Sequence, residues 1–401
     1  MIRPIHPFPA RMAPSIAIAG LEKLKAKSLV LDPMTGSGTV VRHASELGHQ
    51  AIAFDVDPLA VLITKVWTTP VDDAVVARLT TDVLNNVRNV SDAVELPWID
   101  GDEKTNQFVK FWFANPQRSD LRRLSYVLSQ LDPAYLQPNK RAAYNVLRLA
   151  LSRIIITKNQ GASLARDVSH SRPHKVAESS NYEVIFAFER SVRQIRRLLA
   201  GSPPVGNVSV RLGDARCMKL IGDSEVDAVL TSPPYLNAID YMRGHRLSLV
   251  WLGYNLPSLK NIRSNSIGAE RGSETTWPTH PCIDSLKKVI GEIDKLPHRY
   301  ASVVMRYIED VYGLMSEVAR VLKPEGKAVF VIGNSCLKGI FIQNSEVLIK
   351  AASMVGLRLL HRVERELPTG NRYLPMPADK KKPLGKRIRT ENILTFIRER
   401  G

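Results

Sequence analysis

Five consecutive residues, Thr231-Ser232-Pro233-Pro234-Tyr235, combine groups suited to holding an amine on a flat heterocycle. They follow an apolar run over 226–230 that is typical of a buried parallel strand. Because proline has no backbone N–H, the turn presents acceptors, namely the Ser232 side-chain oxygen and the Pro233 carbonyl. Tyr235 adds an aromatic face on which a base can stack. A plain proline-rich loop after a strand is the alternative interpretation.

A second segment, Asp32 to Thr39, is a glycine-rich connection between a predicted strand at 28–32 and a predicted helix at 39–48. Such a turn lets a ligand approach the backbone closely. No Lys-Ser/Thr pair follows the glycines, so the segment does not match a phosphate-binding P-loop. Asp32 would repel phosphate but suits an ammonium group, and Asp55 ends the next strand, where it can hold ribose hydroxyls. An adenosine with a cationic amino-acid tail, S-adenosylmethionine, fits both carboxylates.

These segments resemble those of the amino-methyltransferases that act on DNA bases. Residues 32–39, Asp-Pro-Met-Thr-Gly-Ser-Gly-Thr, resemble the cofactor loop of that family, and residues 231–235 resemble its catalytic loop. Residues 5–14 are similar to the N-terminal stretch that closes over the methionine part of the cofactor. Residues 212–215 resemble the region in which an acid, here Asp214, binds the adenine amino group. The resemblance covers the segments 1–65 and 205–401.

The resemblance implies a cofactor site and a catalytic site built from these segments. In this family Ser-Pro-Pro-Tyr usually accompanies methylation of cytosine N4, whereas Asp- or Asn-Pro-Pro-Tyr usually accompanies methylation of adenine N6. The implied catalytic residues are Ser232, Pro233, Pro234 and Tyr235. The implied cofactor-binding residues are Phe8, Pro9, Asp32, Pro33, Thr35, Gly36, Ser37, Gly38, Thr39, Asp55, Asp57, Asp214 and Thr231.

The implied activity is that of a DNA methyltransferase which flips a base out of the duplex and methylates its exocyclic amine, cytosine N4 first of all. Proximity and orientation suffice for this transfer without a covalent enzyme intermediate. The alternatives are an adenine-N6 enzyme, an RNA amino-methyltransferase, and a catalytically silent DNA-binding protein. The retained Asp32, Gly36, Gly38, Asp55 and Tyr235 argue against the last. Family resemblance also suggests a separate restriction enzyme as a partner.

The composition is that of a globular protein with a strongly basic surface. The 401 residues carry a formal net charge of +17. Basic residues concentrate in 110–200 and 358–401, whereas 1–109 is slightly acidic. Phosphate contacts with DNA or RNA would use this charge, and a solvated basic surface is the alternative. The three scattered cysteines suggest neither a disulfide framework nor a metal site. Without a bilayer-length apolar run or a signal peptide, we expect a cytoplasmic, nucleoid-associated protein.

Alternating strand and helix patterns predict an α/β fold of the Rossmann-like, class I methyltransferase type with a mostly parallel seven-stranded sheet. Strands are expected at 28–32, 51–55, 207–212, 226–231, 327–333, 357–366 and 391–398. Helices are expected near 14–25, 39–48, 58–66, 182–200, 302–322 and 343–355. The pattern assigns residues 1–69 and 206–401 to a catalytic domain. Residues 70–205 form a mainly helical insertion and a candidate target-recognition region.

Helices are expected within the insertion at 74–90, 119–130, 140–156 and 182–199. Its aromatic residues are predicted to form a small core rather than a base-stacking surface. They are Trp98, Phe108, Phe111, Trp112 and Phe113.

Two polar, basic segments are candidates for contact with DNA. Residues 165–174 interrupt the helical periodicity and form either a solvent loop or a DNA-contacting loop. Residues 236–246 follow the catalytic loop; we favour contact with DNA there, with the charged first turn of a helix as the alternative. Residues 255–300 are expected to form a mobile loop. The candidate nucleic-acid-binding residues are Arg166, His170, Ser171, Arg172, Arg243, Arg246 and Arg372.

Overall fold

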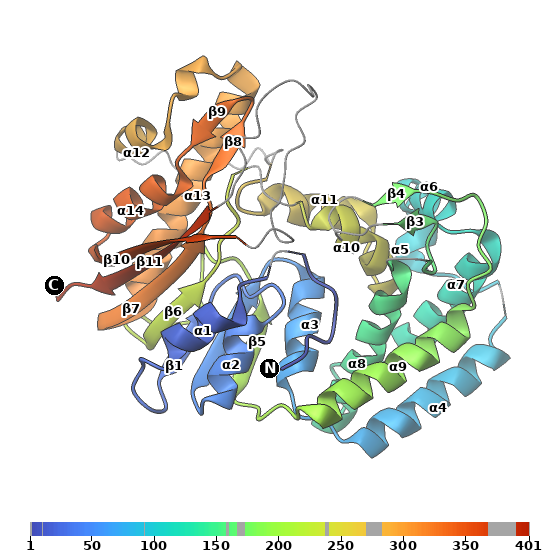
Figure 1. The fold of residues 1–401 in the computed structure, drawn as a ribbon. Helices are drawn as coiled ribbons and strands as arrows, with labels where there is room; N and C mark the ends of the chain where they lie inside the picture. Colours follow the sequence, from blue (N-terminus) through green and yellow to red (C-terminus); the bar gives the residue numbers. More distant parts are fainter. Residues whose placement is uncertain are drawn as a thin grey trace.

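The computed structural model describes residues 2–9, 11–91, 93–157, 160–166, 173–236, 240–269, 283–367 and 390–400. They form a seven-stranded sheet with helices on both faces and a group of helices beside it (Figure 1). The strands of the sheet are β1 (Leu29–Asp32), β2 (Gln50–Asp55), β5 (Val208–Leu212), β6 (Val226–Thr231), β7 (Leu322–Ile332), β10 (Leu357–Glu366) and β11 (Thr390–Arg398). All seven lie where the sequence predicts strands.

One strand begins earlier than predicted. β7 starts at Leu322 rather than at residue 327, and its pairing with β6 is irregular. Val226 of β6 pairs with Leu322, but Ala228 pairs with Lys327, so the intervening residues of β7 bulge out of the ladder.

The strand order is β10-β11-β7-β6-β1-β2-β5. β5, β2, β1, β6 and β7 run parallel, whereas β11 is antiparallel to both of its neighbours. A mostly parallel sheet with one reversed strand next to its edge is the class I methyltransferase arrangement, so the predicted fold class is confirmed. The carboxyl ends of the parallel strands share one edge, where such sheets bind ligands.

Each face of the sheet is covered by helices. α1 (Pro14–Leu21) and α2 (Thr39–Glu46) cover one face, and α13 (His298–Val321) and α14 (Asn344–Met354) cover the other. Alternate side chains of β1 explain both layers: Val30 belongs to the core under α1 and α2, and Leu31 to the core under α13. In the described part of the chain, every helix is too short or too polar to cross a membrane.

The helices beside the sheet share one apolar core with the catalytic elements. They are α4 (Asp73–Asn89), α5 (Pro97–Asp100), α6 (Glu103–Trp112), α7 (Asn115–Ser129), α8 (Pro138–Ile155) and α9 (Val184–Gly201). Their core also includes residues of α3 (Pro58–Thr68) and α10 (Met242–Leu249). The short strands β3 (Ala165–Arg166) and β4 (His174–Lys175) form a hairpin. The segment after the catalytic loop is therefore built into this helical group.

Four of the five predicted core aromatics lie in or against that core. Phe113 is fully buried, and Trp98, Phe108 and Trp112 pack against the cluster. The prediction is wrong for Phe111, which is 52% exposed. Its ring lies on the surface of α6, where the Lys175 ammonium group is 4.9 Å from the ring centroid.

The loop predicted over 255–300 is in large part helical. It contains α11 (Leu256–Asn265), α12 (Ile283–Ile290) and the start of α13, while 270–282 lies outside the described residues. The Asn255 side chain caps α11 by accepting a hydrogen bond of 2.9 Å from Ser258 N. Asparagine, serine and proline therefore mark a helix start here rather than an irregular loop, so the mobile-loop prediction is wrong for these segments.

One buried arginine of α2 joins the two ends of the helical insertion. The Arg42 guanidinium donates hydrogen bonds to Trp67 O (2.7 Å), at the end of α3, and to Ser202 O (2.8 Å), just after α9. It also reaches Pro203 O at 3.2 Å and pairs with Glu46 at 2.7 Å. A single side chain thus bonds carbonyl groups of both segments that connect the sheet to the helical group, one before α4 and one after α9.

We expect Arg42→Met to lower the free energy of unfolding by about 3 kcal/mol, because several buried carbonyl groups would lose their donor. Urea denaturation followed by circular dichroism measures this change. The matched control is Arg88→Met on the exposed face of α4, which should change stability by less than about 0.5 kcal/mol. Equal stability of Arg42→Met and the wild type would contradict this role of Arg42.

Candidate active site

Three parallel strands end side by side at the candidate site. β1 lies between β2 and β6, and Asp32 at the end of β1 pairs in register with Ala53 of β2. At the end of β6, the Thr231 hydroxyl donates a hydrogen bond of 2.8 Å to Asp32 Oδ1. The cofactor loop after β1 and the catalytic loop after β6 therefore start from bonded neighbours, although 199 residues separate them in sequence.

The cofactor loop is held by Asp55 at the end of β2. Gly36 N donates a hydrogen bond of 2.8 Å to Asp55 Oδ2. Gly36 and Gly38 both have positive φ, +51° and +83°. A Cβ atom on Gly36 would lie 3.1 Å from the Phe8 ring, and one on Gly38 would lie 2.9 Å from Thr64 Oγ1. Both positions therefore require glycine, by conformation and by space.

The N-terminal segment lies over this loop through Phe8. The Phe8 ring stacks on Tyr241, with centroids 5.2 Å apart and planes at 24°, and lies 5.4 Å from the His245 ring. His245 Nδ1 is 2.5 Å from Asp57 Oδ2. Asp57 Oδ1 accepts a hydrogen bond of 2.8 Å from Leu59 N and so caps α3. Asp57 therefore has both carboxylate oxygens bonded within the protein.

His245 and Tyr241 are members of the site that the sequence analysis missed as such. No sequence pattern relates Tyr241 and His245 to the cofactor loop, because they meet Phe8, which lies over that loop, only in the folded chain. The remaining predicted loop residues lie at the start of α2 or beside it. Pro33, Ser37 and Thr39 are buried there, and the hydroxyls of Ser37 and Thr39 are 3.2 Å apart. Pro9, in the N-terminal segment, is buried as well.

The two strand-end carboxyls have strongly raised pKa values. Burial raises the pKa of Asp32 to about 7, against the hydrogen bond from Thr231 that lowers it. Burial, followed by the charge of Asp57, raises the pKa of Asp55 to about 7. A cationic ligand would relieve this unfavourable burial of negative charge.

Asp214 follows β5 and binds the side chain two residues further on. Arg216 donates to Asp214 through its backbone N (2.8 Å), Nε (3.0 Å) and Nη2 (2.6 Å). The Asp214 side chain is 28% exposed, so a face of the carboxylate stays open to a ligand. Arg216 is a second residue that the sequence analysis missed.

S-adenosylmethionine fits the residues present. Two carboxyls with raised pKa values suit an ammonium group and ribose hydroxyls, and Gly36 leaves backbone space beside Phe8. In the described part of the chain, the buried Thr35 Oγ1 has no hydrogen-bond partner, as expected of a group that bonds a ligand. Among the described residues, no three His, Cys, Asp or Glu side chains gather as a metal site.

In the catalytic loop, the hydroxyl proton of Ser232 is used in a hydrogen bond within the protein. Ser232 Oγ donates a hydrogen bond of 3.0 Å to Val331 O of β7. Its oxygen is therefore left to accept from another group. Pro233 and Pro234 contribute no N–H, and Tyr235 lies against Gly268, where a Cβ atom would be 3.6 Å from Tyr235 O. The acceptor-only turn predicted from the sequence is compatible with these contacts.

Arg243 and Arg246 of α10 form a cluster with Arg263 of α11, called here the arginine cluster. Asp240 Oδ2 lies 3.0 Å from Arg243 Nε and 2.5 Å from Arg263 Nη2. The Arg246 guanidinium is 5.1 Å from the centroid of the Phe108 ring. Burial lowers the pKa of Arg246, and the charge of Arg263 lowers it further. Arg263 is a third residue that the sequence analysis missed.

Of the other predicted DNA contacts, the structure describes Arg166. Arg166 is exposed on β3, in the hairpin next to α6 (Figure 1). His170, Ser171, Arg172 and Arg372 lie outside the described residues.

The fold and the cofactor loop together define a methyltransferase that uses S-adenosylmethionine. The chain is similar to type II DNA methyltransferases over most of its length. It is 23% identical to the type II methyltransferase M.MvaI of Kocuria varians, over 92% of this chain and 84% of that protein. It is 21% identical to M.BsoBI of Geobacillus stearothermophilus, over 82% of this chain and 73% of that protein. It is 22% identical to M.AvaI of Anabaena variabilis, over 86% of this chain and 76% of that protein.

Likeness to solved structures is weaker. A TehB-like methyltransferase from Corynebacterium glutamicum aligns with 96% of this chain and 88% of its own, at 8% identity and a TM-score of 0.30. No family model matches the chain.

Cofactor binding should strengthen as the pH rises from about 6 to about 7.5, because an ammonium group binds the ionised form of Asp32. Asp32→Asn keeps an acceptor for Thr231 but removes the charge. We expect it to bind the cofactor more weakly, with a shallower pH dependence. Calorimetric titration with S-adenosylmethionine at several pH values measures both. Affinity that stays flat or falls with pH in the wild type would contradict the assignment.

The free energy of unfolding of the cofactor-free protein should fall as the pH rises, whereas cofactor affinity should increase. Asp32 and Asp55 have folded pKa values of about 7, above the ordinary value of 3.8. The folded state therefore binds more protons than the unfolded state between these pH values. These two groups then lower the free energy of unfolding as pH rises from about 4 to about 7.

Proposed function

We propose that this chain is a site-specific DNA methyltransferase that methylates the exocyclic amine of a flipped base, cytosine N4. The hydrogen bond from Ser232 Oγ to Val331 O supports this proposal most directly. It uses the hydroxyl proton, so the Ser232 oxygen can only accept, which matches the donors of an amino group. The similarity to type II DNA methyltransferases over more than four-fifths of the chain points to DNA as the polymer.

The residues of the catalytic loop would orient the amine rather than activate it covalently. Ser232 Oγ and the Pro233 carbonyl accept its two hydrogens, and Tyr235 stacks on the ring, so that the nitrogen lone pair faces the cofactor site. The bound cofactor supplies an electrophilic methyl group. Asp32, Thr35 and Asp55 hold it at the ends of β1 and β2, and Asp214 binds its adenine from the end of β5. Phe8 covers its methionine part.

DNA would meet the protein beyond the catalytic loop. The arginine cluster starts within ten residues of Tyr235 and carries three guanidinium groups, of which those of Arg243 and Arg263 pair with Asp240. The Arg243 and Arg263 side chains are about one-third exposed, so a phosphate can reach them. We assign base reading to the insertion, residues 70–205, with Arg166 as a contact. A separate restriction enzyme would recognise the same sequence.

Nucleoside analysis of DNA from cells that express this chain tests the proposal. We expect N4-methylcytosine in the digest. Ser232→Ala should lower kcat by about 100-fold, because the amine loses an orienting acceptor. Its cofactor Kd should stay unchanged, since Ser232 lies outside the cofactor loop. Ser353→Ala, an exposed serine of α14, is the matched control.

Other products would overturn separate parts of the proposal. N6-methyladenine in the digest would refute the choice of base but not the chemistry. Labelled methyl groups transferred to RNA and not to DNA would refute the polymer. No labelled product with either polymer would refute the activity.

Asp240→Asn should bind duplex DNA more tightly than the wild type, because it removes a carboxylate that competes with phosphate for Arg243 and Arg263. Arg263→Ala should bind more weakly, with a salt slope about one unit shallower. Fluorescence anisotropy at several salt concentrations measures both, with Arg88→Ala on α4 as control. Unchanged DNA affinity in Arg263→Ala would exclude the cluster from the interface.

A further inference from the structure

A buried acid of α13, Asp310, is joined to the adenine-binding candidate Asp214 through Arg216. The Arg216 guanidinium bonds the Asp214 carboxylate on one side and Asp310 Oδ1 through Nη1 on the other. The Asp310 side chain is 1% exposed and that of Arg216 is 5% exposed. Ninety-four residues separate them, so the pairing exists only in the folded chain. One guanidinium therefore bridges two carboxylates from different elements.

The same bridge continues to the catalytic loop. Arg216 Nη2 also donates to Asn265 O at the end of α11, three residues before Gly268. Gly268 has a φ of +73° and lies against the Tyr235 backbone. Hydrogen bonds of Arg216 thus link Asp214 and Asp310 to Asn265, and the segment from Asn265 to Gly268 leads to the backbone of Tyr235.

Stability alone does not account for this bridge. A buried ion pair is often no more stabilising than apolar residues of similar volume, because both charges lose their hydration. Burial raises the pKa of Asp310, and the charge of the neighbouring Arg216 is the strongest of the effects that lower it. At one end, Arg216 contacts Asp214, a candidate for cofactor binding. At the other end it contacts Asn265, in the segment that leads to the catalytic loop.

We infer that Arg216 is a positioning residue that couples cofactor binding to binding of the target nucleotide. The inference rests on the proposed function, because it takes Asp214 as the adenine ligand and Tyr235 as the stacking residue. A ligand that fixes the Asp214 carboxylate also fixes Arg216, and through it residues 265–268 and the backbone of Tyr235. Cofactor and polynucleotide should then each raise the affinity of the protein for the other by the same factor.

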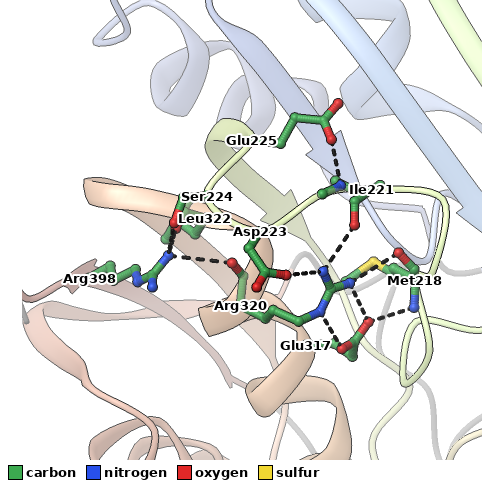
Figure 2. A network of polar contacts seen from close by, with 10 residues as sticks. Met218, Ile221, Asp223, Ser224, Glu225, Glu317, Arg320, Leu322 and Arg398 are labelled. Atoms are coloured by element: carbon green, nitrogen blue, oxygen red, sulfur yellow. Dashed lines mark hydrogen bonds and ion pairs between the residues drawn. The ribbon is translucent and has the colours of Figure 1, made fainter.

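The protein contains a matched control for this bridge. Figure 2 shows Arg320, ten residues after Asp310 on α13, bound to the same connection between β5 and β6. Its guanidinium donates to Ile221 O, Met218 O and Asp223, and pairs with Glu317 of its own helix. Arg320 thus ties the same connection to the same helix as Arg216. Among the described residues, the partners of its guanidinium all lie outside the cofactor loop and the catalytic loop.

The experiment measures the Kd of S-adenosylmethionine with and without saturating duplex DNA, and in parallel with single-stranded RNA. In the wild type we expect DNA to lower this Kd about tenfold. The double variant Arg216→Met/Asp310→Leu replaces the ion pair by apolar side chains and leaves no buried charge behind. Arg216→Lys keeps one charge but has no fork with which to bond both carboxylates. In both variants the factor should fall to about one, while the protein stays folded by circular dichroism.

Arg320→Ala should retain the tenfold factor even if it lowers the melting temperature. Retention of the factor in the double variant would overturn the inference, as would an equal loss in Arg320→Ala. A wild-type protein without coupling to either polymer would also overturn it. The readout is binding rather than methyl transfer. A failure of the proposed function would appear separately, as missing methylated nucleosides.

Discussion

The buried hydrogen bond from Thr231 to Asp32 sets the geometry on which the site depends. Because β1 and β6 are parallel neighbours, their carboxyl ends lie together, and this bond joins the loops that follow them. Asp32 is at once a structural acceptor and a carboxyl whose burial raises its pKa. The sheet thereby places an incompletely stabilised negative charge beside the catalytic loop, and a cationic cofactor is the ligand that such a charge favours.

The helical insertion takes part in this site rather than standing apart from it. Ser152 of α8 lies 3.0 Å from His6 Nε2, and Arg153 donates to Ile5 O, so α8 anchors the segment that places Phe8 over the cofactor loop. α10 packs against α8 through a hydrogen bond of 3.4 Å from Ser248 to Ser152 O, and it supplies His245 to Asp57. The helical insertion therefore helps to hold the N-terminal segment over the cofactor loop.

The sequence errors have a common physical cause. Asparagine, serine and proline suggested a loop over 255–300, yet Asn255 caps a helix, and Ile283, Leu286 and Ile290 bury one face of another. Capping residues and loop residues have the same composition, so only the neighbouring core decides between them. The prediction that Phe111 is a core residue failed for a related reason, because this ring lies on the exposed face of its helix.

The sequence by itself determined the seven strands, the acceptor-only turn at 232–234 and the glycine loop after Asp32. These features arise from apolar periodicity, missing donors and φ angles, all of which act within a few residues. Only the tertiary structure decided that Arg216 bridges Asp214 and Asp310 and that His245 meets Asp57. The Arg216–Asp310 and His245–Asp57 pairs join residues 94 and 188 positions apart. Their partners are selected by the packing of helices on a sheet, which no local pattern encodes.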